Sequence, residues 1–101
     1  MQTVWKYQVT LGLTRDTEEK LATWIVDMPL HAKVLSVQSQ FGQQVMWVEV
    51  ETENPLVKRT FKIFATGEEM SKVEGKKWSY ISTTQIERGM WTWHLFELTD
   101  E

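Results

Sequence analysis

The sequence predicts an all-β protein: one antiparallel sandwich or small open barrel of six or seven strands, with at most one short helical turn. Apolar and polar residues alternate with the period of a half-buried strand over most of the chain. Turn-forming residues interrupt this alternation about every ten residues, a spacing typical of sandwiches and barrels. The length of 101 residues suits one hydrophobic core and not two independently folding domains. We therefore expect residues 1–101 to form a single β domain.

The N-terminal part predicts two strands separated by a polar segment. Apolar odd positions alternate with polar even positions over residues 4–11, which predicts the first strand. Residues 14–20 are polar and compatible with a helix, but they are too few for a helix that is stable without packing. We expect a loop or one helical turn there, followed by a second strand at residues 22–27.

The centre of the chain predicts a β-hairpin. A strand around residues 35–38 leads to a turn at residues 40–43, which contains Gly42. The returning strand places alternate residues on two sides. Its expected core side holds Met46, Val48 and Val50, and its other side holds Trp47, Glu49 and Glu51.

A break at residues 53–55 separates this hairpin from the next strand, because Pro55 fixes φ and donates no ladder hydrogen bond. Residues 60–65 alternate again. The expected core side of this strand holds Phe61, Ile63 and Ala65, and the opposite side holds Thr60, Lys62 and Phe64. Residues 66–77 contain two glycines and alternating charges, which predicts a long connection.

Two further strands, at residues 78–86 and 90–98, are joined by a tight turn at residues 87–89. The last strand is apolar on both sides. One side carries Trp91, Trp93 and Leu95, and the other carries Met90, Thr92, His94, Phe96 and Leu98. Such a strand either lies between two packed layers or presents an aromatic side to a partner.

Tryptophan is the unusual feature of the composition, with six residues in the chain. Trp47 lies on the side of its strand that the core does not need, and the same question arises for Trp91 and Trp93. Protein interfaces are enriched in Trp, so these three residues are candidates for binding a protein partner or a second copy of the chain. The alternative is packing within the fold, where cross-strand aromatic pairs stabilise a sheet.

A second candidate site combines basic and aromatic residues. Residues 58–77 hold six basic and three acidic side chains, and Lys58 and Lys62 share one side of their strand. The binding candidates of this region are Lys58, Arg59, Lys62, Trp78 and Tyr80. Stacking aromatics beside cations are the arrangement that holds nucleotides or single strands. The alternative is a solvated, charged sheet edge that discourages aggregation.

The sequence argues against enzymatic chemistry and against a bound cofactor. It lacks cysteine, a phosphate-binding loop and any recognised spacing of a serine nucleophile with histidine and aspartate. Its two histidines, His31 and His94, fall on different elements, and nothing in their spacing predicts a metal site. We expect a non-enzymatic protein without metal or cofactor.

Net charge and hydropathy exclude further partners. A formal charge of −3 argues against non-specific binding to duplex nucleic acid, which requires many phosphate contacts. No stretch approaches the roughly 18 apolar residues of a membrane span, and the opening residues have no secretory signal pattern. We expect a cytoplasmic protein that binds no membrane.

The order of several motifs resembles a small protein family from bacteriophages and bacteria. The match covers nearly the whole chain, although residues 13–23 and 72–78 are longer here. The matching features are Lys6-Tyr7, a Met-Pro-x-x-Ala-Lys-x-Leu-Ser-Val-Gln segment at residues 28–38, Trp47, Arg59-Thr60-Phe61-Lys62-Ile63, Thr66-Gly67 and His94-Leu95-Phe96-Glu97. The resemblance implies an accessory protein of a phage, and it carries over no activity.

The function expected from these observations is binding. The first hypothesis is an accessory protein that inhibits a host defence or regulatory protein through an aromatic surface, as a homodimer in the bacterial cytoplasm. The first alternative is a small-ligand binder that sequesters a nucleotide signal, with aromatics stacking the base and Lys or Arg holding the phosphates. The second alternative is a minor virion or assembly component.

Overall fold

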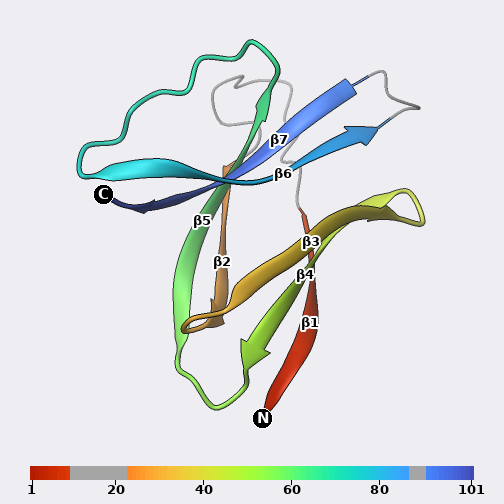
Figure 1. Ribbon diagram of the computed structural model, residues 1–101, viewed down its shortest axis with the longest axis vertical. Helices are drawn as coiled ribbons and strands as arrows, with labels where there is room; N and C mark the ends of the chain where they lie inside the picture. Colours follow the sequence, from red (N-terminus) through yellow and green to blue (C-terminus); the bar gives the residue numbers. More distant parts are fainter. Residues whose placement is uncertain (10–22, 87–90) are drawn as a thin grey trace.

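The structure of the chain is a computed structural model that describes residues 1–9, 23–86 and 91–101 (Figure 1). The described part is all-β, with seven strands in two antiparallel sheets that do not close into a barrel. The strands are β1 (Gln2–Gln8), β2 (Thr23–Pro29), β3 (Lys33–Gln40), β4 (Gln43–Glu51), β5 (Leu56–Ala65), β6 (Lys76–Ile86) and β7 (Trp91–Asp100). The predicted all-β fold is therefore confirmed. The helical turn expected at residues 14–20 and the turn at residues 87–89 lie outside the described residues.

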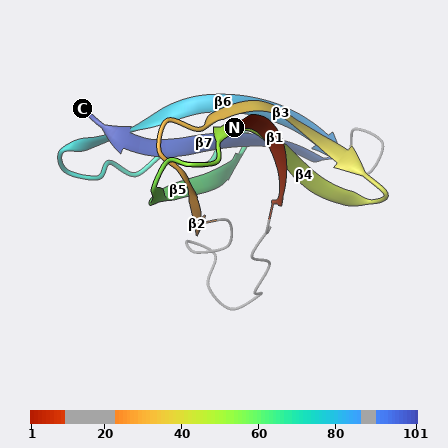
Figure 2. The ribbon, with the colours of Figure 1, turned by 90° about the horizontal axis from the view of Figure 1, so that it is seen from below.

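Sheet A has the order β1-β4-β3, and sheet B has the order β2-β5-β7-β6. The chain switches from one sheet to the other several times: β1 lies in sheet A, β2 in sheet B, β3 and β4 in sheet A, and β5 to β7 in sheet B. The sheets meet where β3 packs against β6 and β2 against β4. The molecule is flat when seen from below (Figure 2), and its principal extents are 39 × 37 × 22 Å.

The core lies between the inner faces of the two sheets. From sheet A it contains Met46, Val48 and Val50, which are 0%, 0% and 1% exposed, as the alternation in their strand predicts. Phe61 and Ile63 come from β5 of sheet B, and Trp24 stacks on Phe61 with 5.6 Å between ring centroids. This core is thin, so aromatic stacking supplies part of its volume.

Two expectations for side-chain orientation are wrong in β5. Ala65, expected on the core side, is exposed, because the strand ends there at the start of the 66–75 loop. Phe64, expected on the polar side, is only 2% exposed. Burial of Phe64 on the side away from the core means that sheet B is covered on both faces at this point.

The β3–β4 hairpin confirms the turn predicted at residues 40–43. Only Phe41 and Gly42 separate the strands, with φ angles of 49° and 80°. Two positive φ values in a two-residue loop are the signature of a type I′ turn, whose twist matches the twist of the flanking strands. Glycine adopts this conformation freely, whereas phenylalanine does so at a cost in free energy.

Replacing Phe41 with asparagine should therefore raise the free energy of unfolding by about 0.5–1 kcal/mol, because Asn-Gly suits a type I′ turn. The Phe41 side chain is 97% exposed, so its removal loses little packing. Urea denaturation of the two proteins measures the change. Phe41→Val is the matched control and should lower stability, since a β-branched residue resists positive φ. An equal effect of both variants would contradict this account of the turn.

Tyr7 of β1 packs against the core, and this position changes the pKa of its phenol. Burial raises the pKa of the Tyr7 phenol above its ordinary value of 10.0, and the nearby Arg59 opposes this shift only in part. A raised pKa means that the fold favours the neutral phenol. The contribution to stability is therefore complete below pH 10 and is lost as the pH rises through the pKa of the folded state.

The spectroscopic expectation is a tyrosinate absorbance step above pH 10 in the folded protein that is missing from Tyr7→Phe. The chain has only two tyrosines, so the step is assignable from this one variant. Persistence of the step in Tyr7→Phe would show that Tyr7 is not its source.

Candidate functional site

The face of sheet B that points away from the core, here called the outer face, carries several aromatic residues, of which Tyr80 is exposed. Strand register aligns its residues in rows: Lys62 lies opposite Phe96, and Phe96 lies opposite Tyr80. Thr60, Leu98 and Trp78 form the next row. The apolar and aromatic members of the outer face are Ile25, Phe64, Trp78, Tyr80, Phe96 and Leu98.

Four of these residues form an aromatic cluster. Phe64 meets Trp78 edge to face at 5.2 Å and Phe96 at 5.5 Å, and Tyr80 meets Phe96 at 5.5 Å. The ammonium of Lys62 lies 5.1 Å from the centre of the Phe64 ring, which is a cation–π distance. Edge-to-face pairs have preferred angles, so the cluster fixes the orientation of its rings.

The loop of residues 66–75 folds back over one end of the cluster. Trp78 Nε1 donates a hydrogen bond of 2.9 Å to the Ser71 carbonyl oxygen, and the Thr66 hydroxyl lies 2.8 Å from His94 Nε2. Glu68 pairs with Lys62 at 3.8 Å. These contacts explain how Phe64 becomes buried on the outer face.

The remainder of the outer face stays open to solvent. Ile25 is 62% exposed and Tyr80 is 60% exposed. Met70 and Val73 of the covering loop are also exposed, at 40% and 38%. Exposed apolar side chains therefore occur on both edge strands of the sheet, β2 and β6, and on the loop.

Lys58, Lys62, Trp78 and Tyr80 all lie on the outer face, so the structure brings together four of the five candidates from this region of the sequence. The lysines of this face are ion-paired. Lys58 lies 3.4 Å from Asp27, Lys62 pairs with Glu68, and Lys76 lies 2.8 Å from Asp100. The hydrogen bond from Lys76 lowers the pKa of the Asp100 carboxyl. The outer face is therefore nearly neutral rather than basic.

The fifth candidate, Arg59, lies on the opposite side of β5 and has a structural role. Its guanidinium donates to both carboxylate oxygens of Glu97, at 2.5 and 2.7 Å, and to the Ala32 carbonyl oxygen at 2.6 Å. The side chains of the ion pair are only 18% and 14% exposed. A guanidinium engaged in this way has little capacity left for a phosphate, which weighs against a ligand-binding role for Arg59.

Of the tryptophan candidates whose side chains the structure describes, Trp47 and Trp93 lie on different sheets. Trp93 is half-buried, lies on the inner face and packs against the core, which is the packing alternative rather than the interface. Trp47 is half-buried on the outward side of sheet A, opposite Ser36 and Lys6. The side chain of Trp91 is outside the described part of the structure.

The histidines occupy separate environments. His31 is exposed in the turn after β2, and its φ angle is 69°. His94 is half-buried and bridges Thr66 and Thr83, with Nδ1 lying 3.0 Å from the Thr83 hydroxyl. Within residues 1–9, 23–86 and 91–101, no group of three or more His, Asp or Glu side chains is placed to hold a metal ion.

Sequence reasoning missed Phe64, Phe96, Leu98 and Ile25 as parts of this surface. The alternation places Phe96 and Leu98 on one side of the last strand, but nothing along that strand indicates which side faces the core. The available signal was that Phe64 shares parity with Lys62 while being too large and apolar for a solvated side. A strand with one such residue predicts a second packed layer.

Comparisons with known proteins identify the family of this chain but assign no activity to it. Neither the curated proteins nor the solved structures include a significant match to this sequence. No helix in the described residues is long and apolar enough to cross a membrane. The model of a domain of unknown function, DUF7352, matches residues 1–101, so the chain belongs to the DUF7352 family.

Proposed function

We propose that this chain is a non-enzymatic binding protein that presents the outer face of sheet B to a protein partner. The observation that carries the proposal is the exposure of Tyr80 on β6 and Ile25 on β2, at 60% and 62%, on a face that the core does not use. Interfaces concentrate their binding energy in aromatic anchors surrounded by smaller contacts.

The rigidity of the surface supports this role. Tyr80 is held by the Phe96 ring at 5.5 Å and by a hydrogen bond of 2.8 Å between its hydroxyl and the Thr83 hydroxyl. An anchor that is fixed before binding loses little conformational entropy when the partner arrives. The surface is thus suited to a preformed partner groove or face.

In this proposal the chain is an accessory protein of a phage and acts in the bacterial cytoplasm. The motif resemblance supports the phage origin, and the absence of catalytic motifs in the sequence supports binding rather than chemistry. In this proposal the chain inhibits a host defence or regulatory protein. It does so as a homodimer, which is the common way for a small protein to present two copies of one surface.

A nucleotide is the second candidate ligand, because Lys58 and Lys62 share the face with Trp78 and Tyr80. Ion pairing of these lysines with Asp27 and Glu68 weighs against it, since a phosphate would have to compete with carboxylates already in place. The protein partner is therefore the proposal, and nucleotide binding is an outcome that the experiment separates from it.

The test is a pull-down from host lysate with immobilised wild-type chain, Tyr80→Ser and Ile25→Ser. A specific host protein should be retained by the wild type and reduced at least tenfold by each variant, because large apolar anchors are removed from the contact. Both side chains are mostly exposed, so the melting temperatures of the variants should stay close to that of the wild type.

Val4→Ser is the matched control, since Val4 is 50% exposed but belongs to sheet A. It should retain the host protein as well as the wild type does. Loss of retention in Val4→Ser alone would place the surface on sheet A and refute the proposal. A rise in melting temperature with cyclic or linear nucleotides, without any retained protein, would favour the nucleotide instead. Light scattering of the purified chain measures its mass in solution, which distinguishes a homodimer from a monomer.

A further inference from the structure

β1 is an edge strand of sheet A. It pairs with β4 on one side, and no strand in the described part of the chain pairs with its other side (Figure 1). The register of β1 with β4 runs from Gln2 to Gln8 without a shift. A regular strand with one unpaired side offers a row of main-chain donors and acceptors to another strand.

The hydrogen bonds at the two ends of β1 show which of its residues point their main-chain groups away from β4. Thr52 N donates to the Met1 carbonyl oxygen at 3.0 Å, and Val9 N donates to the Gln44 carbonyl oxygen at 2.9 Å. Hydrogen-bonded pairs alternate along an antiparallel ladder, so the odd-numbered residues of β1 bond to β4. The even-numbered residues direct their N–H and C=O groups to the free edge: Gln2, Val4, Lys6 and Gln8.

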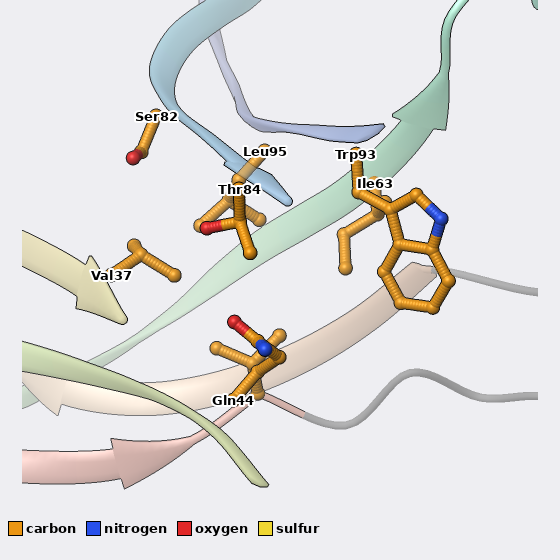
Figure 3. Close-up of a pocket in the computed structure, with 8 residues that line it drawn as sticks. Val37, Gln44, Ile63, Ser82, Thr84, Trp93 and Leu95 are labelled. Carbon is orange, nitrogen blue, oxygen red and sulfur yellow. The ribbon is translucent and has the colours of Figure 1, made fainter. Parts of the chain in front are cut away.

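The other three edge strands of the described residues are less suited to pairing. β3 and β6 lie against each other, where Val37 and Ser82 line one small apolar pocket between the sheets (Figure 3). Each of these two strands also has a shift in its register. On β2, Leu30 N bonds across to the Pro55 carbonyl oxygen, so the neighbouring Pro29 faces the free edge. A proline has no N–H to donate there, and this is a common protection of an edge strand.

Lys6 is the one charged residue of β1, and its side chain is held away from the edge. Its ammonium donates a hydrogen bond of 3.0 Å to Gln40 Oε1 on β3, the far strand of sheet A. The side chain therefore lies back across the sheet. A lysine in this position does not protect the edge of β1 from another strand.

Trp5 leaves an apolar side chain uncovered beside this edge. It lies opposite Val48, so it points to the core side of sheet A, where Val48 is 0% exposed. Trp5 nevertheless remains 38% exposed. A large aromatic side chain is thus open to solvent on the side of the sheet that is otherwise buried, next to main-chain groups that have no partner strand.

We propose that β1 is the dimer interface of this protein, where a second copy pairs with it antiparallel about a two-fold axis at Trp5. The inference rests on the homodimer of the proposed function and specifies where the two copies meet. In this register Trp5 lies opposite Trp5 of the second copy in a non-hydrogen-bonded pair, in which side chains approach most closely. The two copies of sheet A join into one continuous sheet.

Charge and overlap select this register. Val4 lies opposite Lys6 of the second copy, and Gln2 lies opposite Gln8, so all the residues that face the edge find partners. A shift of the two-fold axis by one residue toward Lys6 places the two lysines opposite each other, which is unfavourable. A shift by one residue toward Val4 leaves Gln8 without a partner. The strand is therefore complementary to its own copy, as a two-fold interface requires.

The direct test is oxidation of single-cysteine variants of the full chain, which has no native cysteine. In Trp5→Cys the two sulfurs belong to a directly opposed pair with Cα atoms about 4.5 Å apart, within the range of a disulfide. Mild oxidation should convert most of this variant to a covalent dimer. Thr3→Cys is the matched control on the same side of β1, about 13 Å along the strand from its own counterpart, and it should stay uncross-linked. Equal cross-linking of both variants, or none in Trp5→Cys, would overturn the inference.

Amide hydrogen exchange tests the pairing in the unmodified chain. The amides of Val4 and Lys6 should be protected at high protein concentration, and dilution should accelerate their exchange at least tenfold, because only the dimer bonds them. The amide of Ile25 faces the free edge of β2 and is the internal control, so its exchange rate should not depend on concentration. Exchange at Val4 and Lys6 that behaves as it does at Ile25 contradicts the proposed pairing.

Lys6→Pro removes an N–H that faces the second copy without removing a bond to β4. Light scattering should show a monomer whose circular dichroism is native, whereas Lys6→Met keeps the N–H and should stay dimeric. A native dimer of Lys6→Pro would refute the interface, and the exchange experiment decides if this variant does not fold. A wild-type monomer that retains the host protein refutes the dimer alone. A dimer that retains none refutes the proposed partner alone, because β1 is not part of sheet B.

Discussion

Phe64→Ala should lower the free energy of unfolding by about 3–5 kcal/mol, the range for deleting a buried phenylalanine side chain. Phe64 is 2% exposed and contacts Trp78 and Phe96 edge to face, at 5.2 and 5.5 Å between ring centroids. Its removal leaves a hole beneath the 66–75 loop and deprives Lys62 of its ring contact at 5.1 Å. Urea denaturation followed by tryptophan fluorescence measures the loss.

The control for this prediction is Phe41→Ala, the same replacement at a side chain that is 97% exposed. It should change stability by no more than about 0.5 kcal/mol, as surface substitutions usually do. A loss below about 1 kcal/mol in Phe64→Ala would mean that the loop does not enclose the ring. The outer face would then be an open sheet surface, and the binding surface would have to be redrawn.

Phe64 also shows where sequence reasoning about this fold stops. Alternation in β4 correctly predicted the burial of Met46, Val48 and Val50, although Val45 on the opposite side of that strand is also buried, at 4%. In β5 both Ile63 and Phe64 are buried, at 8% and 2%. The second burial depends on a loop that returns over the sheet, and the only local sign of such a covering segment is a large apolar residue on the polar side of the strand.

The candidate site was predictable to the extent that it depends on strand parity. Lys58 and Lys62 share a face because they are four residues apart in one strand, and this was evident from the sequence. Trp78 and Tyr80 join them only because β7 lies between β5 and β6 in the sheet. Strand order comes from long-range packing, so the sequence grouped these two pairs by their proximity along the chain but could not show that they share a face.

Arg59 forms an ion pair that was unpredictable for a related reason. Its position between Lys58 and Lys62 in a basic stretch favoured a ligand-binding role, but its partner Glu97 is 38 residues away on β7. The pairing of β5 with β7 brings Phe61 opposite Glu97, so a carboxylate arrives beside the guanidinium. The ion pair is a consequence of tertiary structure and has no local signature.

The Arg59–Glu97 pair leads to the last prediction, that Arg59→Met lowers the free energy of unfolding by about 3 kcal/mol. Both side chains are less than a fifth exposed, at 18% and 14%, so the variant leaves a carboxylate shielded from water without its counter-charge. Removing one partner of such a pair is strongly destabilising. The Ala32 carbonyl oxygen also loses its donor at 2.6 Å. Urea denaturation at neutral pH measures the change.

Lys58→Met tests the same replacement of a cation one residue earlier in β5. The side chains of its ion pair with Asp27 are 76% and 52% exposed, and exposed pairs contribute about 0–1 kcal/mol. Comparing the stability changes of Lys58→Met and Arg59→Met therefore separates the effect of burial from the effect of losing a positive charge. The double variant Arg59→Met, Glu97→Gln should recover much of the lost stability, because the isolated buried charge is gone. If it recovers none, the hydrogen bond to Ala32 and the packing of Arg59 over the Phe61 ring, 5.7 Å away, account for the loss instead.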